Sequence, residues 1–131
     1  MKEIITAHRG PQAAGPYSTA VRLNGFIFLS GQIPLDPVTG QLVTGSIEDQ
    51  TARVLENLKL VLEAAGSTLE DVVKTTVFLK DMNDFARMNA AYGRYFPSEP
   101  PARSTIEVAR LPRDVHIEIE AIAVDTRSSR L

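Results

Sequence analysis

The segment 115–124 alternates between two kinds of side chain, and this pattern limits the possible folds more than any other part of the chain. Successive residues of a β-strand point to opposite faces of a sheet. One face is aliphatic and consists of Val115, Ile117, Ile119, Ala121 and Ala123. The other mixes polar and large apolar groups: His116, Glu118, Glu120, Ile122 and Val124. The pattern predicts a sheet with one buried face and a second face that is either solvated or packed against another subunit.

Two amphipathic helices are available to cover the buried face. The first is predicted over residues 47–65, because Ser46 can cap its start and Gly66 can end it. Its inward stripe at helical spacing comprises Thr51, Val54, Leu55, Leu58, Val61, Leu62 and Ala65. The second helix is predicted over residues 83–96. Its stripe comprises Phe85, Met88, Tyr92 and either Tyr95 or Phe96.

Strand-like segments surround these helices. They are residues 20–24 and 26–30, read as two short strands or a bent hairpin around Gly25, followed by 72–80, 104–110 and 115–124. Residues 33–45 carry two prolines and two glycines and are predicted to form a loop. The order predicts an α+β fold in which two helices pack on one face of a sheet.

Composition limits the chemistry. The 131 residues fit a single domain, 1–131, with a frayed tail at about 126–131. The absence of cysteine excludes disulfides, cysteine-based zinc sites and thiol nucleophiles. A net charge of −2 supplies no global positive field for nucleic acid or membranes. No signal peptide or membrane span is evident, so a cytoplasmic location is expected.

Arg103 and Glu118 are the strongest candidates for chemistry. Arg103 follows two prolines at the start of a predicted strand, and its planar guanidinium suits bidentate capture of a carboxylate or phosphate. An ordinary surface arginine would give the same pattern. Glu118 and Glu120 share one strand face about 6.5–7 Å apart. One of them could position water, or both could belong to salt bridges or a solvated face.

Three weaker signals remain. The segments 15–18 and 30–32 contain glycines that could let the backbone approach a ligand, or they are plain turns. Asn89 on the second predicted helix could face a ligand, or it could be exposed or locally bonded. The sequence contains no phosphate-binding glycine loop and no G-x-S-x-G elbow.

In this order and spacing, the segments resemble the RidA/YjgF family from about residue 4 to residue 124. The matching pieces are Gly15–Ser18, Ser30–Pro34, Asn57 with Glu63–Gly66, Val73–Asp81, Asn83–Phe85, Pro101–Ser104, Glu107–Pro112 and Ile117–Ala121.

The resemblance implies a chorismate-mutase-like subunit in a homotrimer, with active sites between subunits. It also implies hydrolysis of 2-iminobutanoate and 2-iminopropanoate, the products of pyridoxal-phosphate-dependent dehydratases, without a metal or organic cofactor. Arg103 matches the arginine that binds the substrate carboxylate, and Glu118 matches the glutamate that holds water. Pocket positions match Tyr17, Ser30, Gly31, Asn89 and Thr105.

Three points qualify the match. Many family members carry cysteine where this chain has Thr105, so a mechanism through a thiol is excluded here. The four-residue connection before the last strand suggests a hairpin with the strand before it, whereas the family fold separates the two, and we follow the family fold. One alternative function is that of an RNA-binding endoribonuclease or translation inhibitor, but the chain has few aromatics and no excess of positive charge to bind RNA. Another alternative is a non-catalytic small-acid sensor or holdase.

Overall fold

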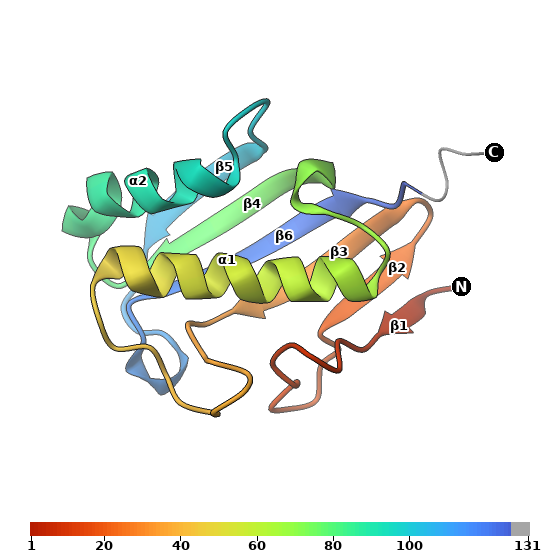
Figure 1. Ribbon diagram of the computed structural model, residues 1–131, viewed down its shortest axis with the longest axis horizontal. Coiled ribbons are helices and arrows are strands. Elements are labelled where there is room, and N and C mark those ends of the chain that lie inside the picture. Colours follow the sequence, from red (N-terminus) through yellow and green to blue (C-terminus); the bar gives the residue numbers. More distant parts are fainter. Residues whose placement is uncertain (127–131) are drawn as a thin grey trace.

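Six strands form one mixed sheet in the computed structural model, which describes residues 1–126 (Figure 1). The strand order is β1-β2-β3-β6-β4-β5, and only the β4–β5 pair is parallel. The strands are β1 (Glu3–Ile5), β2 (Ala20–Leu23), β3 (Phe26–Gln32), β4 (Val72–Leu79), β5 (Ala102–Glu107) and β6 (Ile117–Val124). The tail expected at about 126–131 lies outside the described residues except for Thr126.

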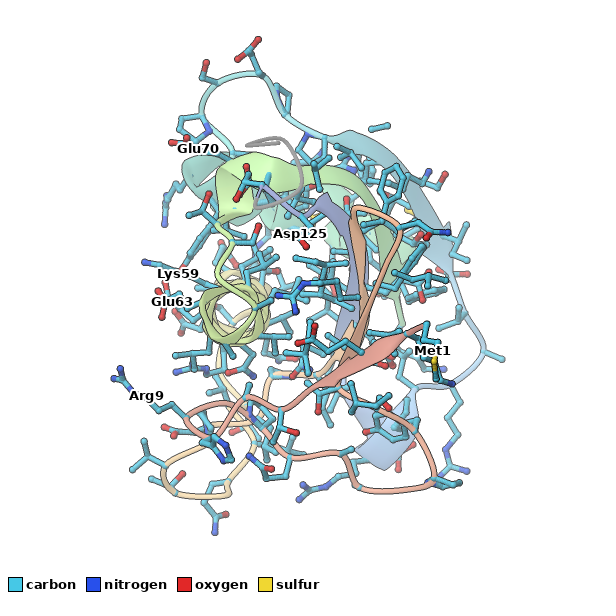
Figure 2. The ribbon with its side chains drawn as sticks, turned by 90° about the vertical axis from the view of Figure 1, so that its right-hand side faces the viewer. Met1, Arg9, Lys59, Glu63, Glu70 and Asp125 are labelled. Carbon is cyan, nitrogen blue, oxygen red and sulfur yellow. The ribbon has the colours of Figure 1, made fainter. Side chains whose placement is uncertain are left out.

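Two helices cover one face of this sheet, as predicted: α1 (Ile47–Ala64) and α2 (Phe85–Tyr95) (Figure 1). The hydroxyl of Ser46 accepts a hydrogen bond from the Asp49 N–H at 3.1 Å and caps α1, and Gly66 ends it with a positive φ of 78°. Every residue of the predicted α1 stripe is buried. Figure 2 shows α1 end-on, with Lys59 and Glu63 pointing away from the sheet. Neither of these helices is long and apolar enough to cross a membrane.

The prediction for α2 needs two corrections. A short 3₁₀ turn, Met82–Asp84, precedes the helix, which begins two residues later than predicted. The helical spacing predicts that Phe85 is buried, but Phe85 is exposed, whereas Met88, Tyr92 and Phe96 are buried as predicted. Phe85 lies in the first turn of α2, where its ring lies 5.5 Å from the guanidinium carbon of Arg103.

The β2–β3 hairpin confirms the predicted pair of short strands. Leu23 pairs with Phe26, and both residues of the Asn24–Gly25 turn have positive φ (51° and 82°). This is the type I′ geometry that matches the twist of the strands. The hairpin places β3 beside β6 in the middle of the sheet.

β4 separates the last two strands. β6 pairs with β3 on one side and β4 on the other, while β5 pairs with β4 at the edge. The hairpin suggested by the short 111–114 connection is therefore wrong, and the arrangement implied by the family resemblance is confirmed. The sequence also gave no expectation of β1, whose three residues pair with β2.

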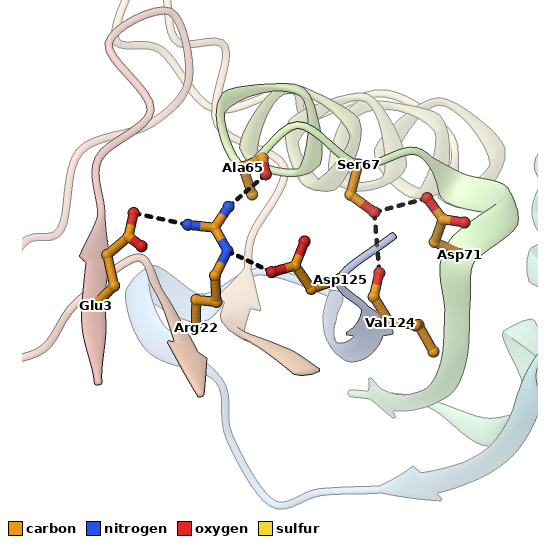
Figure 3. Close-up of polar contacts among 7 residues, drawn as sticks. All are labelled: Glu3, Arg22, Ala65, Ser67, Asp71, Val124 and Asp125. Atoms are coloured by element: carbon orange, nitrogen blue, oxygen red, sulfur yellow. Dashed lines mark hydrogen bonds and ion pairs between the residues drawn. The ribbon is translucent and has the colours of Figure 1, made fainter. Parts of the chain in front are cut away.

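A buried arginine, Arg22, links several elements at the end of the sheet where β6 terminates (Figure 3). Arg22 of β2 forms ion pairs with Glu3 of β1 at 2.7 Å and with Asp125, just after β6, at 3.0 Å. It also donates a hydrogen bond to the carbonyl of Ala65 at the end of α1. The arginine thus joins the edge strand β1 and the end of the central strand β6 to the helix layer.

Candidate functional site

Arg103 lies on the helix-covered face of the sheet. Thr75 of β4 pairs with Arg103 of β5 and with Ala121 of β6, and paired residues share a face. Thr75 and Ala121 are both buried under the helices. The side chain of Arg103 therefore extends toward α2, at the β5 edge.

Glu118 lies on the other face, which no helix covers and which we call the open face. It pairs with Phe78 of β4, which in turn pairs with Ile106 of β5. Ile106 is exposed, and Glu118 and Phe78 are half-buried. Within one chain, the sheet thus separates the two residues that were predicted to act together.

Aromatic rings surround the Arg103 guanidinium. Its central carbon lies 4.8 Å from the centre of the Tyr92 ring and 5.5 Å from that of Phe85, both from α2. These distances are typical of cation–π contacts. Among residues 1–126, no carboxylate forms an ion pair with Arg103. The structure thus presents a half-buried cation, packed on two rings, without an anionic partner in its own chain.

Asn89 and Thr105 belong to the same region. Asn89 lies four residues after Phe85 and three before Tyr92, so it shares their side of α2. Thr105 is two residues beyond Arg103 on β5 and pairs with the buried Val77, which places it on the same sheet face. Asn89 Oδ1 and Thr105 Oγ1 are buried and have no hydrogen-bond partner within the described chain. Unpaired buried polar atoms are costly, and both belong to the helix side and sheet face that carry the guanidinium and its rings.

Gly31 and Glu118 form the centre of a second group, on the open face. Leu29 and Gln32 of β3 pair with Ala121 and Ile119, so two residues, Ser30 and Gly31, oppose one residue of β6. This is a β-bulge, a common means of redirecting a strand beside a site. A side chain at position 31 would overlap the carboxylate of Glu118, so this close approach requires glycine.

Burial affects the carboxyl group of Glu118. Desolvation is the main cause that raises its pKa above the ordinary value for glutamate, and the negative charge of Glu120 raises it further. Glu120 itself is exposed. A carboxylate whose pKa is raised is a stronger base and binds the protons of a water molecule more readily.

Ser30 and Tyr17 complete the second group. The hydroxyl of Ser30 donates to the carbonyl of Ser18 at 2.6 Å, and its N–H donates to the carbonyl of Thr19 at 3.0 Å. These bonds hold the segment after Tyr17 against β3. Tyr17 is 53% exposed and, with Gly31, lines a hollow of about 90 Å³. Ser30 therefore orders the backbone around this hollow.

The structure therefore collects the seven predicted residues in two half-sites. We call Arg103, Asn89 and Thr105, with the rings of Tyr92 and Phe85, the arginine half-site. We call Glu118, Gly31, Ser30 and Tyr17 the glutamate half-site. A larger hollow of about 470 Å³, lined by residues that include Lys59, Tyr95 and Pro97, contains none of the predicted residues.

Sequence reasoning missed Tyr92 and Thr75 as site residues. The pattern predicts Tyr92 in the helix core and Thr75 in a strand, and in the structure their hydroxyl oxygens lie 2.7 Å apart, on the ring that contacts Arg103 and the residue that pairs with it. The sequence contained one indication of their role, because each of these polar hydroxyl groups falls at a position that the pattern makes buried. No three histidine, aspartate or glutamate side chains of residues 1–126 come together as a metal site would require.

Comparison with known proteins identifies close relatives. The family model described as Endoribonuclease L-PSP matches residues 7–125. A RutC family protein of Pyrococcus horikoshii is 58% identical, over 94% of this chain and 98% of that protein. The chloroplastic Reactive Intermediate Deaminase A of Arabidopsis thaliana is 48% identical, over 93% of this chain and 65% of that protein. The crystal structure of the YjgF gene product of Escherichia coli superposes with a TM-score of 0.89 and 50% identity, over 93% of this chain and 98% of that one.

Proposed function

The chain belongs to the Endoribonuclease L-PSP family of YjgF, RidA and RutC proteins, and we propose that it hydrolyses 2-imino acids to 2-keto acids and ammonia. The substrates we propose are 2-iminobutanoate and 2-iminopropanoate. The observation that carries the proposal is the arginine half-site, where a fixed guanidinium has no carboxylate partner within residues 1–126. A reactive intermediate deaminase among the relatives supports the same class of reaction.

Arg103 binds the substrate carboxylate in this mechanism. Its faces contact the rings of Tyr92 and Phe85, so the N–H groups at its edge are the part available to a ligand. Two parallel N–H···O bonds fix both oxygens of a carboxylate and hence the adjacent imine carbon. Such fixation supplies a large part of the rate enhancement in reactions between two positioned partners.

Glu118 holds the water that attacks this carbon. Its raised pKa makes the carboxylate a better proton acceptor than an exposed glutamate. Water adds to the carbon of the protonated C=N group, and Glu118 takes up the proton that the water loses. The resulting carbinolamine receives that proton on nitrogen, and its C–N bond breaks as the hydroxyl group gives its proton to Glu118 and becomes the C=O group. The released ammonia takes this proton from Glu118 and leaves as ammonium, beside the keto acid.

A second copy of the chain completes the site. Arg103 and Glu118 extend from opposite faces of the sheet, so one chain cannot direct both at a small imino acid. The open face also exposes large apolar side chains, namely Ile4, Phe26, Phe28, Val73 and Ile106. Exposed apolar surface of this kind is typical of a subunit interface. We propose a homotrimer in which the open face is buried, and light scattering should give about three times the mass of one chain.

A coupled assay tests the reaction. A threonine dehydratase generates 2-iminobutanoate, and the release of ammonia or 2-oxobutanoate is followed with and without this protein. The expected result is faster release, in proportion to the amount of protein added. Unchanged release with a correctly folded trimer would contradict the proposed function. Dehydratases of this kind, in the cytoplasm, are the proposed source of substrate.

RNA cleavage is a second candidate, because the family's description names an endoribonuclease and because Phe26 and Phe28 expose rings 6.4 Å apart on the open face. Exposed aromatic rings on a sheet can stack on bases. A net charge of −2 supplies little counterion release to hold RNA. RNA retained at about 0.15 M salt, and cleaved in a way that depends on Arg103 or Glu118, would favour this candidate over imine hydrolysis.

A further inference from the structure

We infer that Tyr92 and Thr75 form a positioning pair that fixes the orientation of the Arg103 guanidinium for carboxylate binding. The inference rests on the proposed function for the identity of the ligand. It adds two residues from α2 and β4 that act through Arg103 and need not touch the substrate.

The pair links α2 directly to the sheet beneath the arginine. Tyr92 is 5% exposed, and its hydroxyl oxygen lies 2.7 Å from that of Thr75, which is fully buried. On the sheet, Thr75 is the residue of β4 that pairs with Arg103. One hydrogen bond thus ties the Tyr92 ring to the strand position directly beside the arginine.

Packing restricts the Tyr92 ring further. The ring of Phe96 lies 4.8 Å away, centre to centre, at a tilt of 40°. The hydroxyl end is held by Thr75, so the ring can neither swing outward nor tilt freely. Burial raises the pKa of Tyr92, so the group stays a neutral hydroxyl through the physiological range. The ring therefore offers a fixed surface on which the guanidinium lies.

A fixed ring restricts the arginine in the way that bidentate binding requires. Long arginine side chains lose much rotamer freedom when they are immobilised, and this loss weakens binding if it occurs only when ligand arrives. The contacts with Tyr92 at 4.8 Å and Phe85 at 5.5 Å come from the chain itself, so they restrict the guanidinium independently of any ligand. Because rings contact its face, its N–H edge remains available for two parallel bonds to a carboxylate.

A purely structural role for the hydroxyl pair makes a different prediction. Two buried hydroxyls that only satisfy each other would affect stability and leave the affinity for a carboxylate unchanged. The affinity for 2-oxobutanoate, the keto acid product of the proposed reaction, separates the two roles. It can be measured by calorimetry without any turnover.

Four variants provide the test. Tyr92→Leu removes the ring, and Tyr92→Phe and Thr75→Val remove one hydroxyl each. Tyr95→Phe is the matched control, because Tyr95 lies on the same helix and its hydroxyl donates to the carbonyl of Ala52 at 3.4 Å, away from Arg103. We expect Tyr92→Leu to weaken binding of 2-oxobutanoate about tenfold, the scale of a partly desolvated cation–π contact. The two hydroxyl variants should weaken it by about two- to fivefold, and Tyr95→Phe should leave it unchanged.

Two further readouts address folding and orientation. In the wild type, the ring currents of Tyr92 and Phe85 should shift the Nε–H proton resonance of Arg103, and Tyr92→Leu should remove the part due to Tyr92 while Tyr92→Phe keeps it. In the coupled assay, the affected variants should raise KM more than they lower kcat. If Tyr92→Leu does not fold, Tyr92→Phe and Thr75→Val carry the test.

The outcomes separate this inference from the proposed function. Wild-type affinity for 2-oxobutanoate in all three Tyr92 and Thr75 variants, with affinity lost in Arg103→Ala, would overturn the positioning pair and leave the deaminase proposal standing. Wild-type protein that binds 2-oxobutanoate and shows the predicted variant effects, yet does not accelerate imine hydrolysis, would overturn the deaminase proposal and support the pair. No binding of 2-oxobutanoate by the wild type would overturn the positioning pair, whereas the coupled assay alone decides the deaminase proposal.

Discussion

The helix-covered face and the open face of the same six strands differ in how far they bury apolar side chains. On the covered face, Ile117 and Ile119 of β6 are fully buried. On the open face, Phe28 of β3 is 43% exposed although it occupies a central strand. Arg103 lies at the margin of the covered face, and Glu118 lies on the open one.

The two half-sites differ in the same way. Side chains of α2 order the arginine half-site, where rings contact the guanidinium. The backbone orders the glutamate half-site, where a bulge and a glycine admit the carboxylate. The arginine half-site is thus completed by the packing of one chain, whereas the glutamate half-site faces a surface that one chain leaves uncovered.

The largest expected effect comes from removing the arginine. Arg103→Ala should lower kcat/KM for the imino acid by about a thousandfold, because losing one partner of a partly buried ion pair costs about 4 kcal/mol. Arg103→Lys should lose most of this efficiency too, since lysine keeps the positive charge but cannot donate two parallel hydrogen bonds from one planar group. Thermal melting and light scattering should match the wild type. Near-normal rates in a folded Arg103→Ala trimer would contradict carboxylate capture by this residue.

Mixing inactive variants tests whether the two half-sites come from different chains. In the proposed trimers, co-assembled from Arg103→Ala and Glu118→Gln chains in equal amounts, about a quarter of the sites should combine an intact Arg103 with an intact Glu118. Activity should therefore return to about a quarter of the wild-type rate, whereas each variant alone stays near background. No recovery in trimers shown by mass spectrometry to be mixed would place both residues of each site in one chain.

The next effect distinguishes two carboxylates of one strand. Glu118→Gln keeps the shape but removes the base, and should lower kcat by about a hundredfold. Glu120→Gln is the matched control, because Glu120 is exposed on the same face of β6, and kcat should stay within about twofold of the wild type. The coupled assay measures both. A larger loss in Glu120→Gln than in Glu118→Gln would transfer the role to Glu120.

The smallest effect concerns pH. The wild type should lose activity as pH falls through the raised pKa of Glu118, since the protonated carboxyl cannot accept a proton from water. Glu120→Gln removes a negative charge that contributes to this shift, so the pKa of Glu118 should fall. The acidic limb of the pH–activity profile should therefore move to lower pH. Burial, the larger cause, remains in the variant. A limb that moves to higher pH would contradict this account of the Glu118 environment.

The periodic parts of the fold were predictable from the sequence. The α1 stripe, its Ser46 cap and the two faces of β6 all appear as expected, because local spacing and capping chemistry determine them. The neighbour of β6 was not predictable from spacing. The connection 111–114 is short enough for a hairpin, yet β4 occupies that place through long-range pairing. Only the resemblance to known proteins indicated this order.

For the site, the sequence by itself determined which chemical groups are present and how side chains alternate within a single predicted strand such as 115–124. It determined the guanidinium at Arg103, the carboxyl group at Glu118 and the glycine at residue 31. Tertiary structure alone decided that Tyr92 and Thr75 meet beneath Arg103, and that Arg103 and Glu118 lie on opposite faces. The physical reason is that a period of 2.0 or 3.6 residues specifies direction within one element, whereas contacts between elements depend on which surfaces pack together.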